Sequence, residues 1–177
     1  MESSEDQQSV HLNFRVPALI AHELEKESKR THMSANAVIN DITAKYTKFD
    51  RLITEEHSVT LEGVLFDEII KFVPAEEMSK FGEKLAPNSV RQNLTFLNID
   101  LNIDSLVSRY FKPMGSFSNQ YEFNEMIKGS TRVLLFRHNH GLVWSVYLKH
   151  RLSAIIKSIT GTQPIVEIEN GLVKITC

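Results

Sequence analysis

Residues 10–16 alternate between apolar and polar side chains, and two short helical patterns follow them before residue 50. Such period-two alternation is typical of a strand that buries one face. Pro17 ends the segment, because proline lacks the N–H group that would extend a ladder but suits the first turn of a helix. A strand and two helices of this size cannot bury a stable core alone. The pattern therefore predicts that two copies of the chain pair through these segments.

Two amphipathic helices are expected after the strand. The first covers residues 18–30, where Ile20 and Leu24 lie four positions apart on one face. Ser34 is a natural N-cap for the second helix, since a serine side chain at that position accepts a backbone hydrogen bond. The apolar pattern of this second helix extends to Leu52 and Ile53, and its earlier positions are Val38, Ile39, Ile42, Tyr46 and Phe49.

Residues 9–50 resemble the ribbon-helix-helix family of DNA-binding proteins, the class of the Arc, MetJ and CopG repressors. The resemblance depends on the alternating strand that ends at Val16 and Pro17, on the helix after it, and on Ser34 at the start of the second helix. In this family two chains pair their strands into an antiparallel ribbon that enters the major groove. The resemblance therefore implies a homodimer that binds double-stranded DNA.

The same resemblance implies which side chains would contact DNA. The base-reading face would consist of His11, Asn13 and Arg15. Arginine can contact guanine O6 and N7, asparagine can pair with adenine N6 and N7, and histidine adds a donor or an acceptor. Phosphate would be held at the start of the second helix, because a helix N-terminus binds anions and such contacts set the register. The residues at that position are Ser34, Ala35 and Asn36.

The charge balance limits how such a protein could bind nucleic acid. A formal net charge of −2 argues against an extended polybasic binder, although a compact reader can concentrate positive charge on one face. Between residues 11 and 49, six basic and four acidic side chains leave a net charge of +2. Attraction to phosphate is then modest, and tight binding would depend on the avidity of a dimer or a tetramer.

The composition, 42% hydrophobic and 24% charged, is that of a soluble globular protein. The single cysteine, Cys177, excludes an internal disulfide framework and suits a reducing cytosol. No apolar run reaches membrane-spanning length, and the acidic first six residues lack a signal core. We therefore expect a cytoplasmic protein with no membrane partner.

Residues 57–177 are expected to form a second domain, an α+β sandwich with helices on one side of a mostly antiparallel sheet. Pro87 and the stretch 112–115 are expected to end helices. Asn170 and Gly171 predict a two-residue hairpin turn. The expected helices are 64–73, 75–86, 89–98, 103–112 and 142–159, and the expected strands are 58–61, 121–126, 131–138, 164–169 and 172–176.

No catalytic motif occurs in this second domain: it has no phosphate-binding glycine loop, no serine elbow and no cysteine–histidine metal spacing. A strand-to-helix joint contains His138 and His140, which could ligate a metal with His150 or Cys177. A polar joint packed beneath Trp144 is the preferred interpretation. The aromatic side chains that would line a ligand pocket or fill the core are Phe96, Phe111, Phe117, Tyr121, Phe123, Phe136, Trp144 and Tyr147.

The sequence thus predicts a transcriptional regulator and not an enzyme. Residues 1–8 would form a flexible tail, 9–53 the DNA-binding and dimerisation domain, and 57–177 a domain that binds a small-molecule effector or assembles higher oligomers. No cofactor and no resident metal are predicted. Two alternatives stay open: an antitoxin-like interaction protein whose second domain neutralises a partner, and a metal-dependent sensor that uses His138 and His140.

Overall fold

The computed structural model describes residues 10, 12–51, 53, 60–129 and 131–177, apart from the side chains of residues 85–87. The chain divides into two compact units, which we call the N-terminal unit (residues 1–43) and the C-terminal unit (residues 44–177). The sequence places the domain boundary later, between residues 53 and 57. The two divisions differ because Phe49 is buried in the core of the C-terminal unit.

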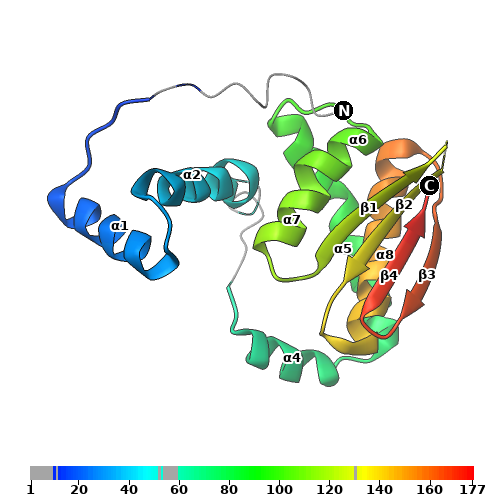
Figure 1. Ribbon diagram of the computed structural model, residues 1–177. Coiled ribbons are helices and arrows are strands. Elements are labelled where there is room, and N and C mark those ends of the chain that lie inside the picture. Colours follow the sequence, from blue (N-terminus) through cyan, green and yellow to red (C-terminus); the bar gives the residue numbers. More distant parts are fainter. Residues whose placement is uncertain (1–9, 11, 52, 54–59, 130) are drawn as a thin grey trace. The chain divides into compact units, whose positions relative to one another are not determined.

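The N-terminal unit contains helices α1 (Ala18–Thr31) and α2 (Ala35–Lys45), the latter running past the division into the C-terminal unit (Figure 1). These helices confirm the two that the sequence predicts. Pro17 precedes α1 as its N-cap residue. At the start of α2 the Ala37 N–H donates to Ser34 Oγ at 3.2 Å, so Ser34 caps this helix as the sequence predicts.

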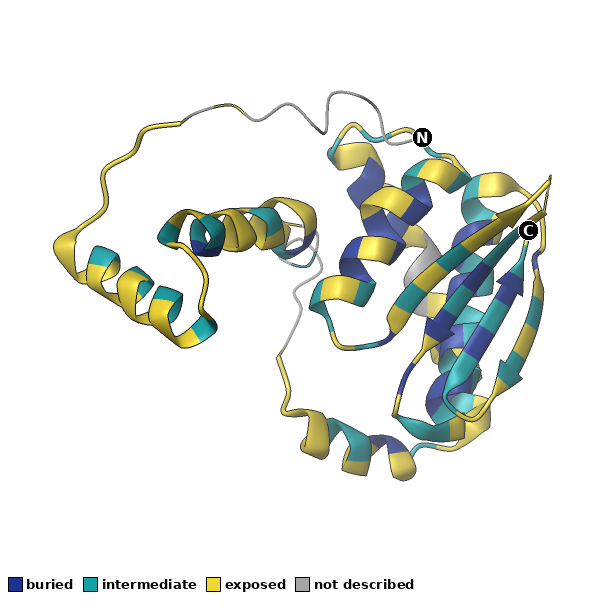
Figure 2. Cartoon of the chain, viewed as in Figure 1, coloured by how far each residue is buried: buried dark blue, intermediate teal, exposed yellow. Residues whose placement is uncertain are grey.

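The predicted strand at residues 10–16 is not found in this chain, since its described residues are assigned to no strand. A ribbon strand exists only when its backbone groups bond to another strand, and one copy of the chain carries one such segment. On the helices beside it, Leu19, Ile20 and Ile42 are exposed, and Leu24 and Ile39 are half-buried. Figure 2 shows α1 without a buried residue. Among the described residues of the N-terminal unit, Val38 alone is buried.

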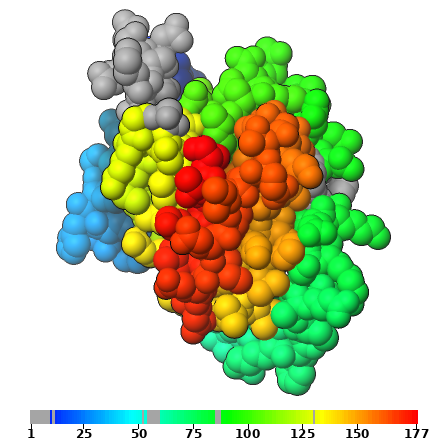
Figure 3. Space-filling model, turned by 90° about the vertical axis from the view of Figure 1, so that its right-hand side faces the viewer, coloured from blue at the N-terminus to red at the C-terminus, as the bar shows by residue number. Residues whose placement is uncertain are grey.

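The C-terminal unit is a mixed helix-and-sheet structure, which confirms the α+β prediction. Its four strands form one antiparallel sheet in the order β1-β2-β4-β3. Figure 3 shows the yellow residues of the first hairpin beside the red residues of the second. The elements are η2 (Tyr46–Asp50), α4 (Gly63–Lys71), α5 (Ala75–Phe96), α6 (Ile103–Leu106), η3 (Val107–Phe111), α7 (Lys112–Phe117), β1 (Glu122–Lys128), β2 (Thr131–Arg137), α8 (Gly141–Thr160), β3 (Ile165–Glu169) and β4 (Leu172–Thr176).

The core lies between one face of this sheet and the helices. Helix α8 packs on β3 and β4, and α5 packs on α8, behind the sheet in Figure 1. The segment η3 covers the other half of the same face, where the Phe111 and Phe136 ring centroids lie 5.2 Å apart. The largest fully buried side chains are Phe111, Phe136, Leu94, Leu106, Leu134, Leu148, Leu152, Ile155, Ile156 and Ile175.

Both predicted helix ends at prolines are wrong. Helix α5 continues through Pro87 to Phe96, because Val90 and Leu94 beyond the proline are fully buried against the rest of the unit. That burial offsets a proline penalty of ~3 kcal/mol. The helical path also continues through Pro113, which follows the π-helical η3 at the first turn of α7, where a missing N–H costs little.

The two C-terminal hairpins and the long helix α8 confirm the sequence predictions. Gly171 has φ +83° in the turn between β3 and β4, a conformation that glycine adopts without strain. Gly161, with φ +74°, ends α8 as its C-cap residue. The predicted short strand 58–61 lies partly outside the described residues, and Thr60 and Leu61 are assigned to no strand.

Candidate functional site

The residues that would contact DNA lie on the surface of the N-terminal unit. Asn13 and Arg15 are exposed, and His11 lies outside the described residues. Ser34 and Asn36 are exposed at the start of α2, and Ala35 is half-buried. The first N–H groups of a helix have no partner within that helix. The N–H groups of Ala35 and Asn36 are of this kind, and such groups at a helix start can bind an anion.

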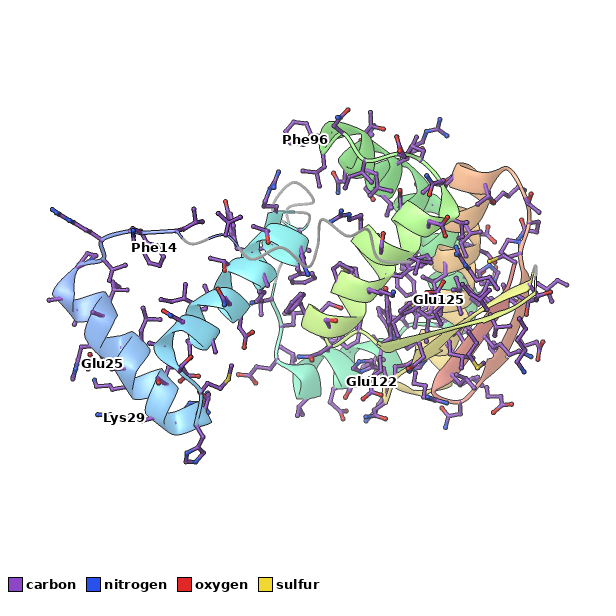
Figure 4. All side chains as sticks on the ribbon, turned by 45° about the horizontal axis from the view of Figure 1, so that its top comes forward. Phe14, Glu25, Lys29, Phe96, Glu122 and Glu125 are labelled. Atoms are coloured by element: carbon purple, nitrogen blue, oxygen red, sulfur yellow. The ribbon has the colours of Figure 1, made fainter. Side chains whose placement is uncertain are left out.

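Positive charge on α1 is partly engaged by its own glutamates. The Lys26 Nζ atom lies 2.7 Å from Glu23 Oε1, and the Arg30 guanidinium lies 2.5 Å from Glu27 Oε1. The hydrogen bond to Arg30 lowers the pKa of Glu27 and raises that of Arg30. These exposed pairs add little stability and reduce the attraction of this helix for phosphate. Figure 4 shows Glu25 and Lys29 pointing outward from α1.

The second site is the joint between β2 and α8, where the side chains of His138 and Ser145 form a buried chain of hydrogen bonds. The His140 N–H donates to His138 Nδ1 at 3.3 Å. His138 Nε2 lies 3.0 Å from Ser145 Oγ, and the Ser145 hydroxyl donates to the Glu169 carbonyl oxygen at 2.8 Å. Because the hydroxyl has one proton, Nε2 is the donor in its bond with Ser145. This arrangement requires a neutral His138.

The environment of His138 agrees with that protonation state. The side chain is buried, and burial lowers its pKa from the ordinary value of 6.5 to about 4, with a smaller contribution from His140. A second ring proton would have to sit on Nδ1, where it would face the N–H of His140. The fold therefore stabilises the uncharged ring.

His140 ties two other segments to the same joint. Its Nδ1 atom lies 2.5 Å from Asp67 Oδ1 on α4, and its Nε2 atom lies 3.2 Å from the Asn119 carbonyl oxygen. The Trp144 ring lies beside His140, and its centroid is 4.9 Å from that of Phe66. The Trp144 Nε1–H group donates to the Gln120 carbonyl oxygen. The joint thus fastens α4 and the segment before β1 to the start of α8.

This geometry supports the polar joint beneath Trp144 and does not support the metal alternative. Both ring nitrogens of His138 and of His140 already have hydrogen-bond partners. His150 instead pairs with Glu83 at 2.7 Å. Among the described residues, no group of three or more His, Cys, Asp and Glu side chains is placed to hold a metal ion.

The His138–Ser145 pair resembles a general base beside a nucleophile, but its geometry opposes that role. Ser145 is fully buried, and its proton is directed to a backbone carbonyl and not to the histidine. An activated serine needs the reverse direction and an accessible oxygen. The pair therefore acts as an internal tie between α8 and the turn that follows β3.

The sequence predicts the histidines of the joint but misses two of their partners. Asp67 lies 73 positions before His140, and its spacing on α4 carries no signal for the pairing. Ser145 follows the joint closely in the sequence, one turn into α8, but nothing in the sequence shows that it bonds to His138. Most of the aromatic residues that the sequence analysis names belong to the core, whereas Phe96 is 73% exposed and projects outward in Figure 4.

The described surface of the C-terminal unit includes two hollows that differ in their lining. The larger, of about 620 Å³, is a groove between α7 and β1 lined by Lys112, Gly115, Ser116 and residues 122–125. The smaller, of about 380 Å³, lies beside α8 and is lined by polar and basic side chains that include Lys149 and His150. Only the first borders an unpaired strand edge.

Comparisons with known proteins add no assignment. No protein-family model matches the chain. Searches of curated proteins and of solved structures found no match either. Among the helices of the described residues, none is long and apolar enough to cross a membrane.

Proposed function

We propose that the chain is a sequence-specific DNA-binding regulator that works as a dimer. In this proposal two N-terminal units pair their extended segments into a ribbon that enters the major groove, with Asn13, Arg15 and His11 facing the bases. The start of α2, at Ser34 and Asn36, binds phosphate. The C-terminal unit supplies regulation or assembly.

The observation that carries the proposal is the near absence of a core in the described part of the N-terminal unit. The apolar side chains that alternate before α1 are exposed, Leu12 at 77% and Phe14 at 60%. Leu19 and Ile20 on α1 are exposed as well. Apolar surface of this extent on so small a unit is typical of an interaction site. A second copy supplies the matching surface by the symmetry of a dimer.

The polar residues support the DNA-binding part of the proposal. Asn13 and Arg15 are exposed on the same alternating segment, in the positions opposite to the apolar ones. Ser34 caps α2 as a phosphate-binding helix start requires. The C-terminal unit has its own buried core, which favours a regulator over an antitoxin whose tail orders only on its partner.

The test is a selection of bound sites from random duplex DNA at fixed salt. The Asn13→Ala/Arg15→Ala variant is compared with Asn88→Ala/Arg137→Ala, which removes the same residue types from exposed positions of the C-terminal unit. We expect a palindromic or repeated motif from the wild type and the control, and no enrichment from the first variant while it remains a dimer. No enrichment from a folded wild-type dimer would contradict the proposal.

A further inference from the structure

The outer edge of β1 presents unpaired backbone groups. Arg132 exchanges two backbone hydrogen bonds with Cys177, so the even residues of β2 face β4 and its odd residues face β1. The register of the two strands then makes the even residues of β1 face β2. The N–H and C=O groups of Phe123, Glu125 and Ile127 therefore face away from the sheet. In the described part of the chain no strand pairs with this edge. An open edge of this kind is a template for an added strand.

Helix α7 turns this edge into a groove. Gly115 allows the close approach, since a Cβ atom there would lie 2.8 Å from Phe123 Cβ. Lys112 and Ser116 form the helical wall, and the groove encloses about 620 Å³. A helix beside a strand edge leaves space for one extended segment and opposes the approach of a second whole sheet. The shape therefore favours a single added strand.

We propose that the groove between α7 and β1 binds the extended segment of residues 10–16 from a second copy of the chain, antiparallel to β1. The proposal rests on the proposed function in one respect: the segment that docks is the one that would form the DNA-binding ribbon, and the two pairings compete. The outward backbone groups of β1 can pair with an extended strand, and the side chains favour one register. In that register the opposing pairs are Arg15–Glu122, Phe14–Phe123, Asn13–Asn124, Leu12–Glu125 and Val10–Ile127.

Apolar side chains match on one side of this pairing. Phe14 is 60% exposed and would pack on Phe123, while Val10 would cover Ile127, which is 62% exposed at the end of β1. Cross-strand pairs of aromatic and branched side chains stabilise adjacent strands. Figure 4 shows Phe14 on the segment before α1. Each copy would thus cover apolar side chains that the single chain leaves in water.

Charges match on the other side. Arg15 would lie opposite the exposed Glu122, and Asn13 opposite Asn124. On the apolar side, Glu125 would lie opposite Leu12. Its charge is already paired there, because its carboxylate lies 3.1 Å from Arg132 Nε and 3.7 Å from Lys112 Nζ. Figure 4 labels Glu122 and Glu125 on β1. A shift of two residues would separate Arg15 from Glu122 and Phe14 from Phe123, so these two pairs favour the proposed register.

This docking would regulate DNA binding. Asn13 and Arg15 would lie beside Asn124 and Glu122 on one face of the sheet, and their strand could not enter the major groove as a ribbon at the same time. The two states compete for one strand, and the observed DNA affinity equals the affinity of the undocked protein multiplied by the fraction that is undocked.

The test is disulfide trapping in the full chain, with Cys177→Ser as background. Asn13→Cys and Asn124→Cys variants are mixed and exposed to a mild oxidant without DNA. Residues opposite each other in a pair without direct backbone hydrogen bonds bring their Cα atoms to ~4.5 Å, which a disulfide spans. The matched control mixes Asn13→Cys with Met126→Cys, whose exposed position lies two residues further along β1.

The expected result is a covalent pair of chains from the first mixture, on the order of tenfold above the control mixture, because Cα atoms more than ~7 Å apart do not bridge. Equal yields from the two mixtures, or no covalent pair, would overturn the docking. In a chain that carries both Asn13→Cys and Asn124→Cys, a link formed within one chain would overturn the assignment to a second copy.

A duplex that the protein selects separates this inference from the proposed function. It should lower the yield of the covalent pair if one strand serves both partners. Bound duplex without any effect on the yield would overturn the regulatory competition. Selected DNA with no covalent pair would reject the docking and keep the DNA-reading proposal. A covalent pair from a protein that selects no DNA would keep the docking and reject the DNA-reading proposal.

Discussion

The two units of the chain use helices of similar pattern in opposite ways. Helix α1, with 14 residues, buries none of them, whereas α8, with 20 residues, buries six. Both carry apolar side chains at helical spacing. The difference is that α8 lies between a sheet and α5, while the N-terminal unit has no second layer within its described residues. An amphipathic helix is thus stable only where a partner surface exists, and the dimer proposed above would supply that surface to the N-terminal unit.

The largest effect is expected from breaking the core that only the C-terminal unit has. Phe136→Ala removes a fully buried ring that contacts the rings of Phe111, Tyr121 and Phe123. A cavity of this kind costs ~3–5 kcal/mol of unfolding free energy, to be measured by urea denaturation followed by Trp144 fluorescence. Leu19→Ala on α1, where the side chain is exposed, is the control and should leave this transition unchanged. Equal losses of unfolding free energy in the two variants would contradict the assignment of the core to the C-terminal unit.

A pH titration sharpens the comparison at the histidine joint. His138 has a pKa of about 4 in the folded chain, below the ordinary 6.5, so the unfolded chain takes up the proton first as pH falls. Stability from this group is complete above pH 6.5 and is lost as pH falls toward 4, by about 3 kcal/mol. Urea midpoints at pH 7 and pH 4.5 measure the loss. In His138→Gln this part of the pH dependence should disappear, and an unchanged slope would reject the assignment.

Breaking the N-terminal unit should change assembly and not the C-terminal core. Phe14→Ser removes an exposed apolar side chain whose burial in a dimer is worth ~1.5–3 kcal/mol. Sedimentation should show a dimer that dissociates at higher protein concentration than the wild type, with the fluorescence transition of Trp144 unmoved. The matched control is Phe96→Ser, an exposed phenylalanine of the C-terminal unit. Weakened dimers from the control alone would place the interface elsewhere.

The smallest effect concerns the internal tie of the joint. Ser145→Ala leaves His138 Nε2 and the Glu169 carbonyl oxygen without their hydroxyl partner, which costs ~1–3 kcal/mol because both groups are buried. Ser108→Ala, at an exposed position of η3, should cost less. Urea midpoints of the two variants decide the matter, and similar values would mean that the tie adds no stability.

Much of the local structure could be predicted from the sequence. Alternation and a two-residue Asn170–Gly171 turn indicated the last hairpin, where glycine alone adopts φ +83° without strain. The helices after Pro17 and Ser34 followed from capping and spacing within a few residues. Such features depend on neighbours along the chain, so the sequence contains the whole physical cause.

Other features were decided by tertiary structure. Helix α5 passes through Pro87 because the burial of Val90 and Leu94 offsets the cost of a proline inside a helix. From the sequence alone, that cost predicts the end of the helix. The neutral state of His138 and the pairing of His140 with Asp67 arise from segments that meet only in the folded unit. The sequence by itself determined where helices and turns can form. Packing decided which breaks are tolerated and which polar groups meet, because burial and hydrogen bonding between distant segments outweigh local preferences of a few kcal/mol.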